Sequence, residues 1–389
     1  MNTRLLASES HADVTDAFRR LADIADRGLP RMLLPSGDVF CHRALQRSGG
    51  ALELEGVSER YTAMTVIGAE RWAAHGGEVS LSLGPIYDRL AAWSQASPGD
   101  LGLVLWAQLQ RGDARAEATA KRILSTRAQV FAPTSDFASM EMGFLLNGLA
   151  AGRKAGLPGV AEFADEVANT LLANQSAATA LFSFGRAVRR KNFLRTRRDV
   201  KLGSFASQVY PTMGLAALTA AGGDAKYLEA ARRCADRIAS LQGPEGQWWW
   251  IYQRDRGVPA CRYPVYSVHQ DAMGPMILLA VAAAARQPRR YDAAVAKSLA
   301  WFDRRAECAG ETIVDDPEGM VWRAVQHDDP AHTGLLGLGD GEVRRLTRIA
   351  WTGGADARPF ARGFVCPECR PYHLGWVWLA AAMWAESLA

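Results

Sequence analysis

The feature of this 389-residue sequence that most limits its fold is a recurring pair of helical segments. In each pair, a helix rich in Ala, Gly and other small residues is followed by a longer helix that carries Arg and Glu. One pair spans residues 210–241, and the same plan returns at residues 272–302. Helical hairpins that recur about every 45 to 60 residues indicate a repeat array.

Apolar residues at helical spacing predict helices along most of the chain, with little strand signal between them. The expected helices cover residues 11–27, 62–74, 85–94, 99–111, 115–129, 138–155, 159–176, 206–221, 226–241, 270–286, 289–306 and 371–388. The sequence therefore predicts an all-α protein.

The two kinds of helix suggest two layers. Small-residue helices pack closely and suit an inner ring, whereas the charged helices suit an outer one. About twelve helices arranged in this way close into an (α/α)6 toroid. We expect one domain over residues 1–389, in which residues 1–58 form an N-terminal helix plus an irregular loop. An open α-solenoid that only binds proteins is the alternative.

Composition argues against nucleic-acid and membrane roles. The chain is 49% hydrophobic and 22% charged, with a net charge of +4. This charge is small for the length, and the Arg runs lie in one segment, so we expect no nucleic-acid partner. The longest apolar run, residues 272–285, is too short to cross a bilayer, so we expect no transmembrane segment.

The cysteines indicate a reducing compartment. Six are scattered along the chain and no secretory segment precedes them, which predicts a cytoplasmic protein. Cys366 and Cys369 have the spacing of zinc ligands, but a structural zinc site normally needs a second such pair. Cys41, His42 or His373 could complete a site through the fold, so zinc stays an alternative; we expect no metal and no cofactor.

Residues 242–276 form the connector with the most unusual composition. It contains three consecutive tryptophans together with tyrosines, arginines, a histidine and an aspartate. A loop this long is usually functional.

Within this connector, Gln242, Gly246 and Trp248 match the QxxxGxW repeat of squalene-hopene and other terpenoid cyclases. In that repeat the glutamine caps a helix, the glycine permits a turn and the tryptophan packs on the next helix. A weaker copy contains Gly319 and Trp322. The hairpin and the small-residue helix after it equally resemble sugar-processing toroids, namely unsaturated glucuronyl hydrolases, polysaccharide lyases and uronyl epimerases. The resemblance covers residues 205–325 and implies the architecture rather than a reaction.

The terpenoid resemblance lacks its catalytic motifs. Cyclases that protonate their substrate carry a DxDD acid, and those that ionise a diphosphate carry DDxxD with magnesium; this sequence has neither. The runner-up is therefore a terpenoid cyclase-like enzyme that uses a lone aspartate, and the third alternative is a non-catalytic binding toroid.

Two sets of polar residues stand just before inner-type helices, one between residues 262 and 271 and the other near the C-terminus. In a closed toroid such positions face the same mouth of the central cavity, so we expect them to share one site. The candidate catalytic residues are Arg262, Tyr266, His269, Asp271, Arg370 and His373, and the candidate substrate-binding residues are Trp248, Trp250, Tyr263, Glu368, Tyr372 and Asp136.

These residue types suit chemistry on a sugar carboxylate. Removing the proton next to the carboxylate needs a cation such as Arg370 to stabilise the enolate. It also needs a base and an acid, roles that fit His269 and Tyr266 among others. Hydrolysis would instead use carboxylates such as Asp271 and Glu368, and tryptophans would stack on sugar faces.

Each candidate also has a structural explanation. The tryptophans fit a packed core, the histidines fit buried packing positions, and Asp136 and Glu141 fit a helix start. Arg60, Tyr61 and Tyr210 also precede or open inner-type helices and are weaker candidates for the cavity rim. The sequence thus predicts an enzyme acting on a sugar or uronic-acid-containing glycan as a lyase, epimerase or hydrolase. Its substrate would be a small molecule or an oligosaccharide; the oligomeric state stays open.

Overall fold

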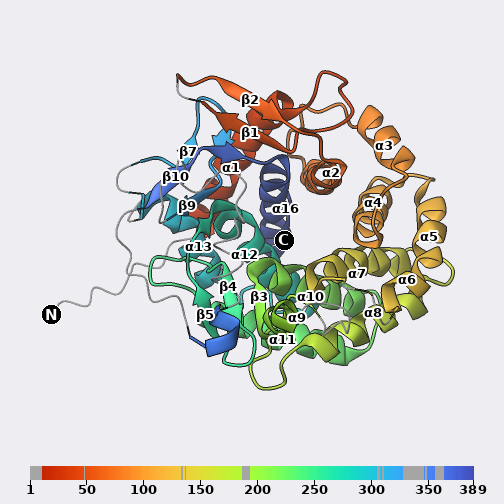
Figure 1. Cartoon of the computed structure of the whole chain (residues 1–389). Helices are drawn as coiled ribbons and strands as arrows, with labels where there is room; N and C mark the ends of the chain where they lie inside the picture. The colour runs from red at the N-terminus through yellow and green to blue at the C-terminus, as the bar shows by residue number, and fades with distance from the viewer. Residues whose placement is uncertain are drawn as a thin grey trace.

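The structure is a computed structural model in which alternating helices form two concentric rings (Figure 1). It describes residues 11–47, 49–132, 135, 137–185, 193–304, 307–308, 311–326, 346, 348–354 and 363–389. The inner helices within this part are α2 (Glu59–Ala74), α4 (Pro98–Arg111), α7 (Ser139–Lys154), α10 (Phe205–Ala220), α12 (Gly274–Ala284) and α16 (Pro371–Leu388). The outer helices are α1 (His11–Met32), α3 (Leu83–Ala92), α5 (Ala116–Ser125), α8 (Val160–Asn174), α11 (Ala225–Ser240) and α13 (Asp292–Arg304).

The inner ring closes on itself. Each inner helix packs against the next, and α16 packs against α2, so the last inner helix returns to the first. This arrangement is the predicted (α/α)6 toroid, and the open solenoid is excluded because its ends would not meet. Two further short helices, α6 (Arg127–Phe131) and α9 (Phe193–Lys201), lie in connections.

Small residues allow the inner helices to touch through their backbones. A Cβ atom at Gly68 of α2 would lie 1.8 Å from the carbonyl oxygen of Gly375 in α16, and one at Gly148 of α7 would lie 2.2 Å from that of Gly102 in α4. A side chain at either position would force the helices apart. The prediction that small-residue helices form the inner ring is therefore explained by direct backbone contact.

Short strands join the helices at one end of the ring. They are β1 (Arg43–Gln46), β2 (Leu52–Glu55), β3 (Leu202–Ser204), β4 (Ile251–Gln253), β5 (Val258–Cys261), β6 (Val265–Tyr266), β7 (Val314–Asp315), β8 (Met320–Val321), β9 (Ala324–Gln326), β10 (Phe364–Cys366) and β11 (Glu368–Cys369). They form sheets β11-β1-β2, β10-β9-β6 and β3-β4-β5 and the pair β7-β8. Each is too short to show a period of two in the sequence, so the helical pattern concealed them.

The N-terminal segment needs a correction. Residues 33–58 are not simply an irregular loop, because they contain the antiparallel pair β1 and β2. Strand β1 also pairs with β11, with Leu45 opposite Glu368. The segment therefore ties the start of the chain to the strand that precedes the last inner helix.

The GxW hairpins fasten neighbouring outer helices. Gln242 donates a hydrogen bond from Nε2 to the carbonyl oxygen of Ala294 in α13 at 3.0 Å. Gly246, with φ of 102°, lies so close to α13 that a Cβ would approach the Lys297 carbonyl oxygen to 2.0 Å. Trp248 is fully buried and donates from Nε1 to Ser298 Oγ at 2.6 Å. The motif therefore packs the hairpin after α11 onto the next outer helix.

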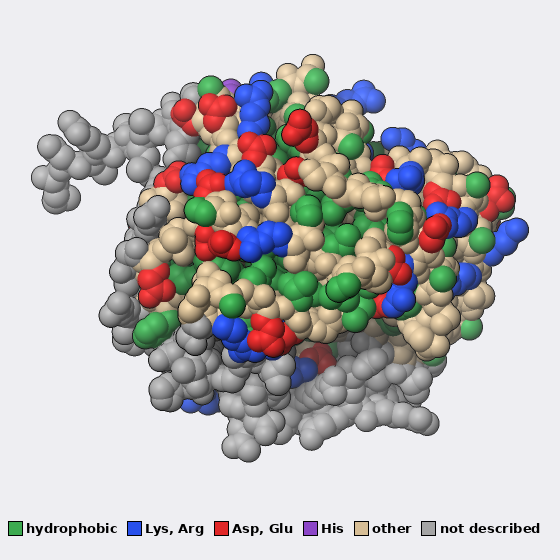
Figure 2. All heavy atoms as spheres, turned by 90° about the horizontal axis from the view of Figure 1, so that it is seen from above, with side chains coloured by type: hydrophobic (Ala, Val, Ile, Leu, Met, Phe, Trp, Pro, Cys, Tyr) green, Lys and Arg blue, Asp and Glu red, His purple; other side chains and the backbone are tan. Residues whose placement is uncertain are grey.

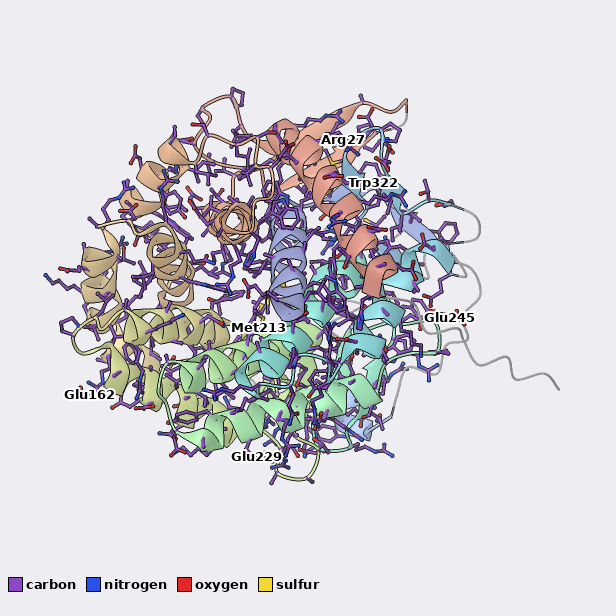
Figure 3. The ribbon with its side chains drawn as sticks, turned by 180° about the vertical axis from the view of Figure 1, so that it is seen from behind. Arg27, Glu162, Met213, Glu229, Glu245 and Trp322 are labelled. Atoms are coloured by element: carbon purple, nitrogen blue, oxygen red, sulfur yellow. The ribbon has the colours of Figure 1, made fainter. Side chains whose placement is uncertain are left out.

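The second hairpin repeats this contact. Gly319, with φ of 69°, meets the backbone of Gly28 in α1, and Trp322 is buried. Figure 3 shows Trp322 beside α1, near Arg27. The internal similarity of the two sequences thus corresponds to a repeated junction between outer helices.

The face of the molecule shown in Figure 2 carries charges of both signs. Figure 2 shows Lys and Arg side chains interspersed with Asp and Glu over the visible face. Many are paired, as Arg27 is with Asp316 and Arg31 with Glu318. Among the helices of the described part, none combines the length and the hydropathy that crossing a membrane requires.

We predict that Trp248→Ala lowers the free energy of unfolding by about 3 to 5 kcal/mol, because it removes a fully buried aromatic side chain and its hydrogen bond to Ser298. Trp351 is 53% exposed, so Trp351→Ala should cost less than about 1 kcal/mol. Urea unfolding of both variants measures the difference. Equal losses would contradict the packing role of Trp248.

Candidate active site

The candidate site lies where inner helices begin. Strand β3 runs directly into α10, β6 precedes the π-helical turn η1 (His269–Met273) that continues into α12, and β11 precedes α16. Because inner and outer helices alternate along the chain, the inner helices share one direction and their N-termini share one mouth. The partial positive charges of these helix ends favour anions there.

A buried carboxylate surrounded by arginines forms one wall. Glu368 is 0% exposed, and its oxygens lie 2.5 Å from Arg370 Nε, 3.1 Å from Arg323 Nη1 and 3.3 Å from Arg43 Nη1. Burial alone would raise the pKa of Glu368, but Arg323, Arg370 and Arg43 outweigh it and hold the pKa below its ordinary value. Glu368 therefore stays ionised and organises three guanidiniums.

Within the described residues, these three guanidiniums form ion pairs with two carboxylates, those of Glu368 and Glu55. Apart from Glu368, Arg43 pairs with Glu55 at 2.5 Å, and Glu55 is also shared with Arg47. Desolvation lowers the pKa of nearby His42, and the positive charge of Arg370 lowers it further. The wall thus carries surplus positive charge.

Tyrosine rings lie against this wall. Arg370 Nη1 donates to the Tyr61 hydroxyl at 2.7 Å, and the Tyr61 and Tyr372 ring centroids are 4.6 Å apart. Arg323 lies over the Tyr266 ring at 5.3 Å. Burial and the neighbouring Tyr61 raise the pKa of Tyr372, so its hydroxyl keeps its proton. Aromatic faces beside hydrogen-bonding cations suit a sugar ring with a carboxylate.

His269 carries an unused hydrogen-bonding atom. It is only 6% exposed, packs against Phe205 at 4.6 Å and Tyr266 at 5.1 Å, and its Nδ1 has no hydrogen-bond partner within the described residues. Burial lowers its pKa to about 3, which a hydrogen bond to the backbone of Trp248 only partly opposes. His269 is therefore neutral near pH 7. Its position in a π-helical turn is typical of functional sites.

Asp271 and His373 join the two polar segments that the sequence singled out. His373 Nε2 lies 2.8 Å from Asp271 Oδ2 and 2.9 Å from Oδ1, and both side chains are buried. Burial raises the pKa of Asp271, and His373 opposes that rise. Residues 102 positions apart thus meet inside the ring. The pair holds η1 against α16.

His269 and Arg370 are connected rather than in direct contact. The Tyr266 ring touches His269 and lies under Arg323, and Arg323 shares Glu368 with Arg370. A continuous chain of contacts therefore links His269 to Arg370, as expected if both side chains belong to one mouth.

A second acidic group lies on the other side of the mouth. Arg60 at the start of α2 pairs with Asp100 of α4 at 2.5 Å and with Glu141 of α7 at 2.6 Å. Burial raises the pKa of Glu141, and Arg60 lowers it only in part. Asp100 also caps α4, since Ser97 N donates to it at 3.0 Å. Two carboxylates thus flank one guanidinium here.

The structure keeps several predicted residues away from this mouth. Trp248 is 0% exposed and packs between helices, so it is unavailable to a substrate, and this corrects its predicted binding role. Arg262 is exposed and stacks on Trp249 at 5.3 Å. Tyr263 donates its hydroxyl to Glu307, whereas Trp250 reaches the Tyr266 ring at 6.2 Å. Asp136 lies outside the described residues.

Sequence reasoning missed Arg323 and Arg43. Arg323 directly follows Trp322 of the second GxW hairpin, and Arg43 lies in β1, which had been predicted as loop. Nothing local marks either as functional, because only the pairing of β1 with β11 and of β6 with β9 brings them to the site. The sequence predicts Glu141 at a helix start, and the structure places it in the first turn of α7.

No group of three or more His, Cys, Asp or Glu side chains in the described part could hold a metal ion. Burial raises the pKa values of Cys366 and Cys369, to about 12 for Cys369, so both stay protonated thiols.

The sequence matches no protein-family model and no curated protein. The fold is similar to solved structures. An unsaturated glucuronyl hydrolase from Bacillus sp. GL1, described as responsible for the degradation of glycosaminoglycan, aligns over 95% of this chain and 96% of its own, with a TM-score of 0.60 and 14% identity. A polysaccharide lyase aligns over 98% of both chains, with a TM-score of 0.55 and 11% identity.

A sugar epimerase from a ruminal bacterium aligns over 88% of this chain and 99% of its own, with a TM-score of 0.57 and 11% identity. The resemblance to sugar-processing toroids is therefore confirmed for the fold. None of these three structures is a terpenoid cyclase.

Because His269 is buried and neutral, we predict that the free energy of unfolding depends on pH. Its pKa is about 3 in the folded protein and near 6.5 when unfolded, so between these values the unfolded chain binds the extra proton. The free energy of unfolding should then fall as pH falls below about 6.5, by up to about 1.4 kcal/mol per pH unit.

His269→Gln should remove the contribution of His269 to this slope, and urea unfolding at pH values from 4 to 7, a range that includes the upper limit of that window, measures it. His11→Gln is the matched control, because His11 is half-exposed and pairs with Asp292 at the surface. An unchanged slope in His269→Gln would show that His269 is not held neutral by burial.

Proposed function

We propose that this protein is an enzyme that acts on a uronic-acid-containing glycan, by moving a proton at the carbon next to the sugar carboxylate. The observation that carries this proposal is the surplus of guanidinium charge around Glu368, held against tyrosine rings at the N-termini of inner helices. A lyase or an epimerase would both use this chemistry.

Recognition of the carboxylate falls to Arg370 and Arg323. Both guanidiniums are partly engaged by Glu368, which fixes their orientation before a substrate arrives. A substrate carboxylate placed between these two largely buried guanidiniums gains charge-assisted hydrogen bonds. The sugar ring would lie against Tyr61 and Tyr372.

The same cations serve the reaction. When the proton leaves the carbon, its electron pair moves into the carboxylate as an enolate, and Arg370 and Arg323 stabilise the added charge. His269 Nδ1, which has no hydrogen-bond partner within the described residues, is the proposed acceptor of that proton. Tyr266 or Tyr372 can return a proton to the opposite face in an epimerase; a lyase would instead expel the neighbouring glycosidic oxygen.

Hydrolysis is the second candidate, and one observation favours it. Glu141 has a raised pKa, as a general acid requires, and Asp100 shares its Arg60 partner. One named structural neighbour is a glucuronyl hydrolase. In this alternative Glu141 would donate the proton, while the Glu368 cluster would only bind the carboxylate.

We predict that turnover of a glucuronate-containing oligosaccharide in D2O places deuterium at the carbon next to the carboxylate, or forms a double bond there, as NMR would show. Arg370→Met should lower kcat by about 10² to 10³, because one stabiliser of the enolate is lost. Arg232→Met, on the surface of α11, is the control. If the products instead carry a new reducing end without a double bond, and if this activity is lost in a Glu141 variant but kept in a His269 variant, the reaction is hydrolysis and the proposal is wrong.

A further inference from the structure

The ring has a cavity at the opposite end from the candidate active site. It has a volume of about 660 Å³ and is lined by residues from the C-terminal halves of all the inner helices described above. Most of its wall is apolar; among the lining residues are Trp106, Met213, Ala217, Ala280, Leu379 and Met383. Figure 3 shows Met213 at the centre of the ring, beside α16. The size is that of typical small-molecule sites.

An aromatic layer separates this cavity from the active-site mouth. Trp106 in the cavity wall packs against Trp376 at 6.2 Å, and Trp376 Nε1 donates to the Tyr210 hydroxyl at 2.9 Å. Trp376 and Tyr210 are buried. None of the residues that line the cavity belongs to the candidate active site.

Two polar side chains in the cavity wall have unused hydrogen-bonding atoms: Asn147 and Gln110, whose Oε1 and Nε2 have no partner within the described residues. Asn147 is 5% exposed, and its Nδ2 donates to the carbonyl oxygens of Gly143 at 2.7 Å and Tyr210 at 3.1 Å. Both amide hydrogens are thus occupied. The amide oxygen Oδ1 accepts no hydrogen bond within the described residues and is not one of the fully buried atoms, so it is accessible from the cavity.

The charges of the cavity lie at its rim. Arg71 and Glu386 pair with each other, and Glu386 also contacts His75 at 2.7 Å; Lys154 is exposed. The other lining residues carry no charge. An ionic ligand would therefore find no counter-charge deep in the cavity, whereas a neutral one would bury apolar surface there.

We infer that this cavity binds a neutral, largely apolar small molecule whose single hydrogen-bond donor meets Asn147 Oδ1. The cavity holds no carboxyl group at its floor, so it does not supply the acid that a protonating terpenoid cyclase needs. This inference is independent of the proposed reaction on a glycan.

The test uses N-phenyl-1-naphthylamine, a neutral fluorescent probe with one N–H donor. We expect saturable binding to the full chain, and about three- to tenfold weaker binding of the N-methylated probe, which lacks the donor. Ala217→Phe should fill the cavity and abolish saturable binding. Ala118→Phe, on the exposed face of outer helix α5, should leave binding unchanged.

Thermal unfolding of each variant confirms that it is folded before binding is compared. Glycan turnover should be the same in Ala217→Phe and the unmodified protein, because the aromatic layer lies between the two sites. Saturable binding that survives Ala217→Phe, or equal affinity for both probes, would overturn the inference.

Discussion

The architecture depends on the contact that closes the ring between α2 and α16. Gly68 and Gly375 bring the two backbones together so closely that a Cβ at Gly375 would lie 2.5 Å from the Cα of Thr65. Since α16 ends the chain and α2 lies near its start, this contact converts a row of hairpins into a closed ring. Any larger side chain at the crossing would open it.

Closure also brings the site together. It places Arg370 beside Tyr61 and His373 against Asp271, contacts that join the first, fifth and last inner helices. Buried charges such as Glu368 and Asp271 lose hydration, and their partners offset this loss only if the geometry is well held. Such groups are weak sources of stability but typical of functional sites, where shifted pKa values serve binding and proton transfer.

The helices and their layers could be predicted from sequence because small-residue and charged segments alternate with a clear helical period. The expectation that His269, Asp271, Arg370 and His373 stand at one mouth followed from that topology alone. Three-dimensional strand pairing was hidden, however, so Arg43 and Arg323 escaped notice. Nor does composition reveal which side of a turn a side chain occupies, which is why the packed Trp248 resembled a sugar-stacking residue.

The most direct test of the account is a crystal structure of the protein with a bound glucuronate-containing oligosaccharide. We predict that the carboxylate lies within hydrogen-bonding distance of Arg370 and Arg323, with the sugar ring against Tyr61 and Tyr372 and the carbon next to the carboxylate facing His269. A saccharide bound instead in the apolar cavity or on the outer ring, with the arginine cluster unoccupied, would contradict the central claim.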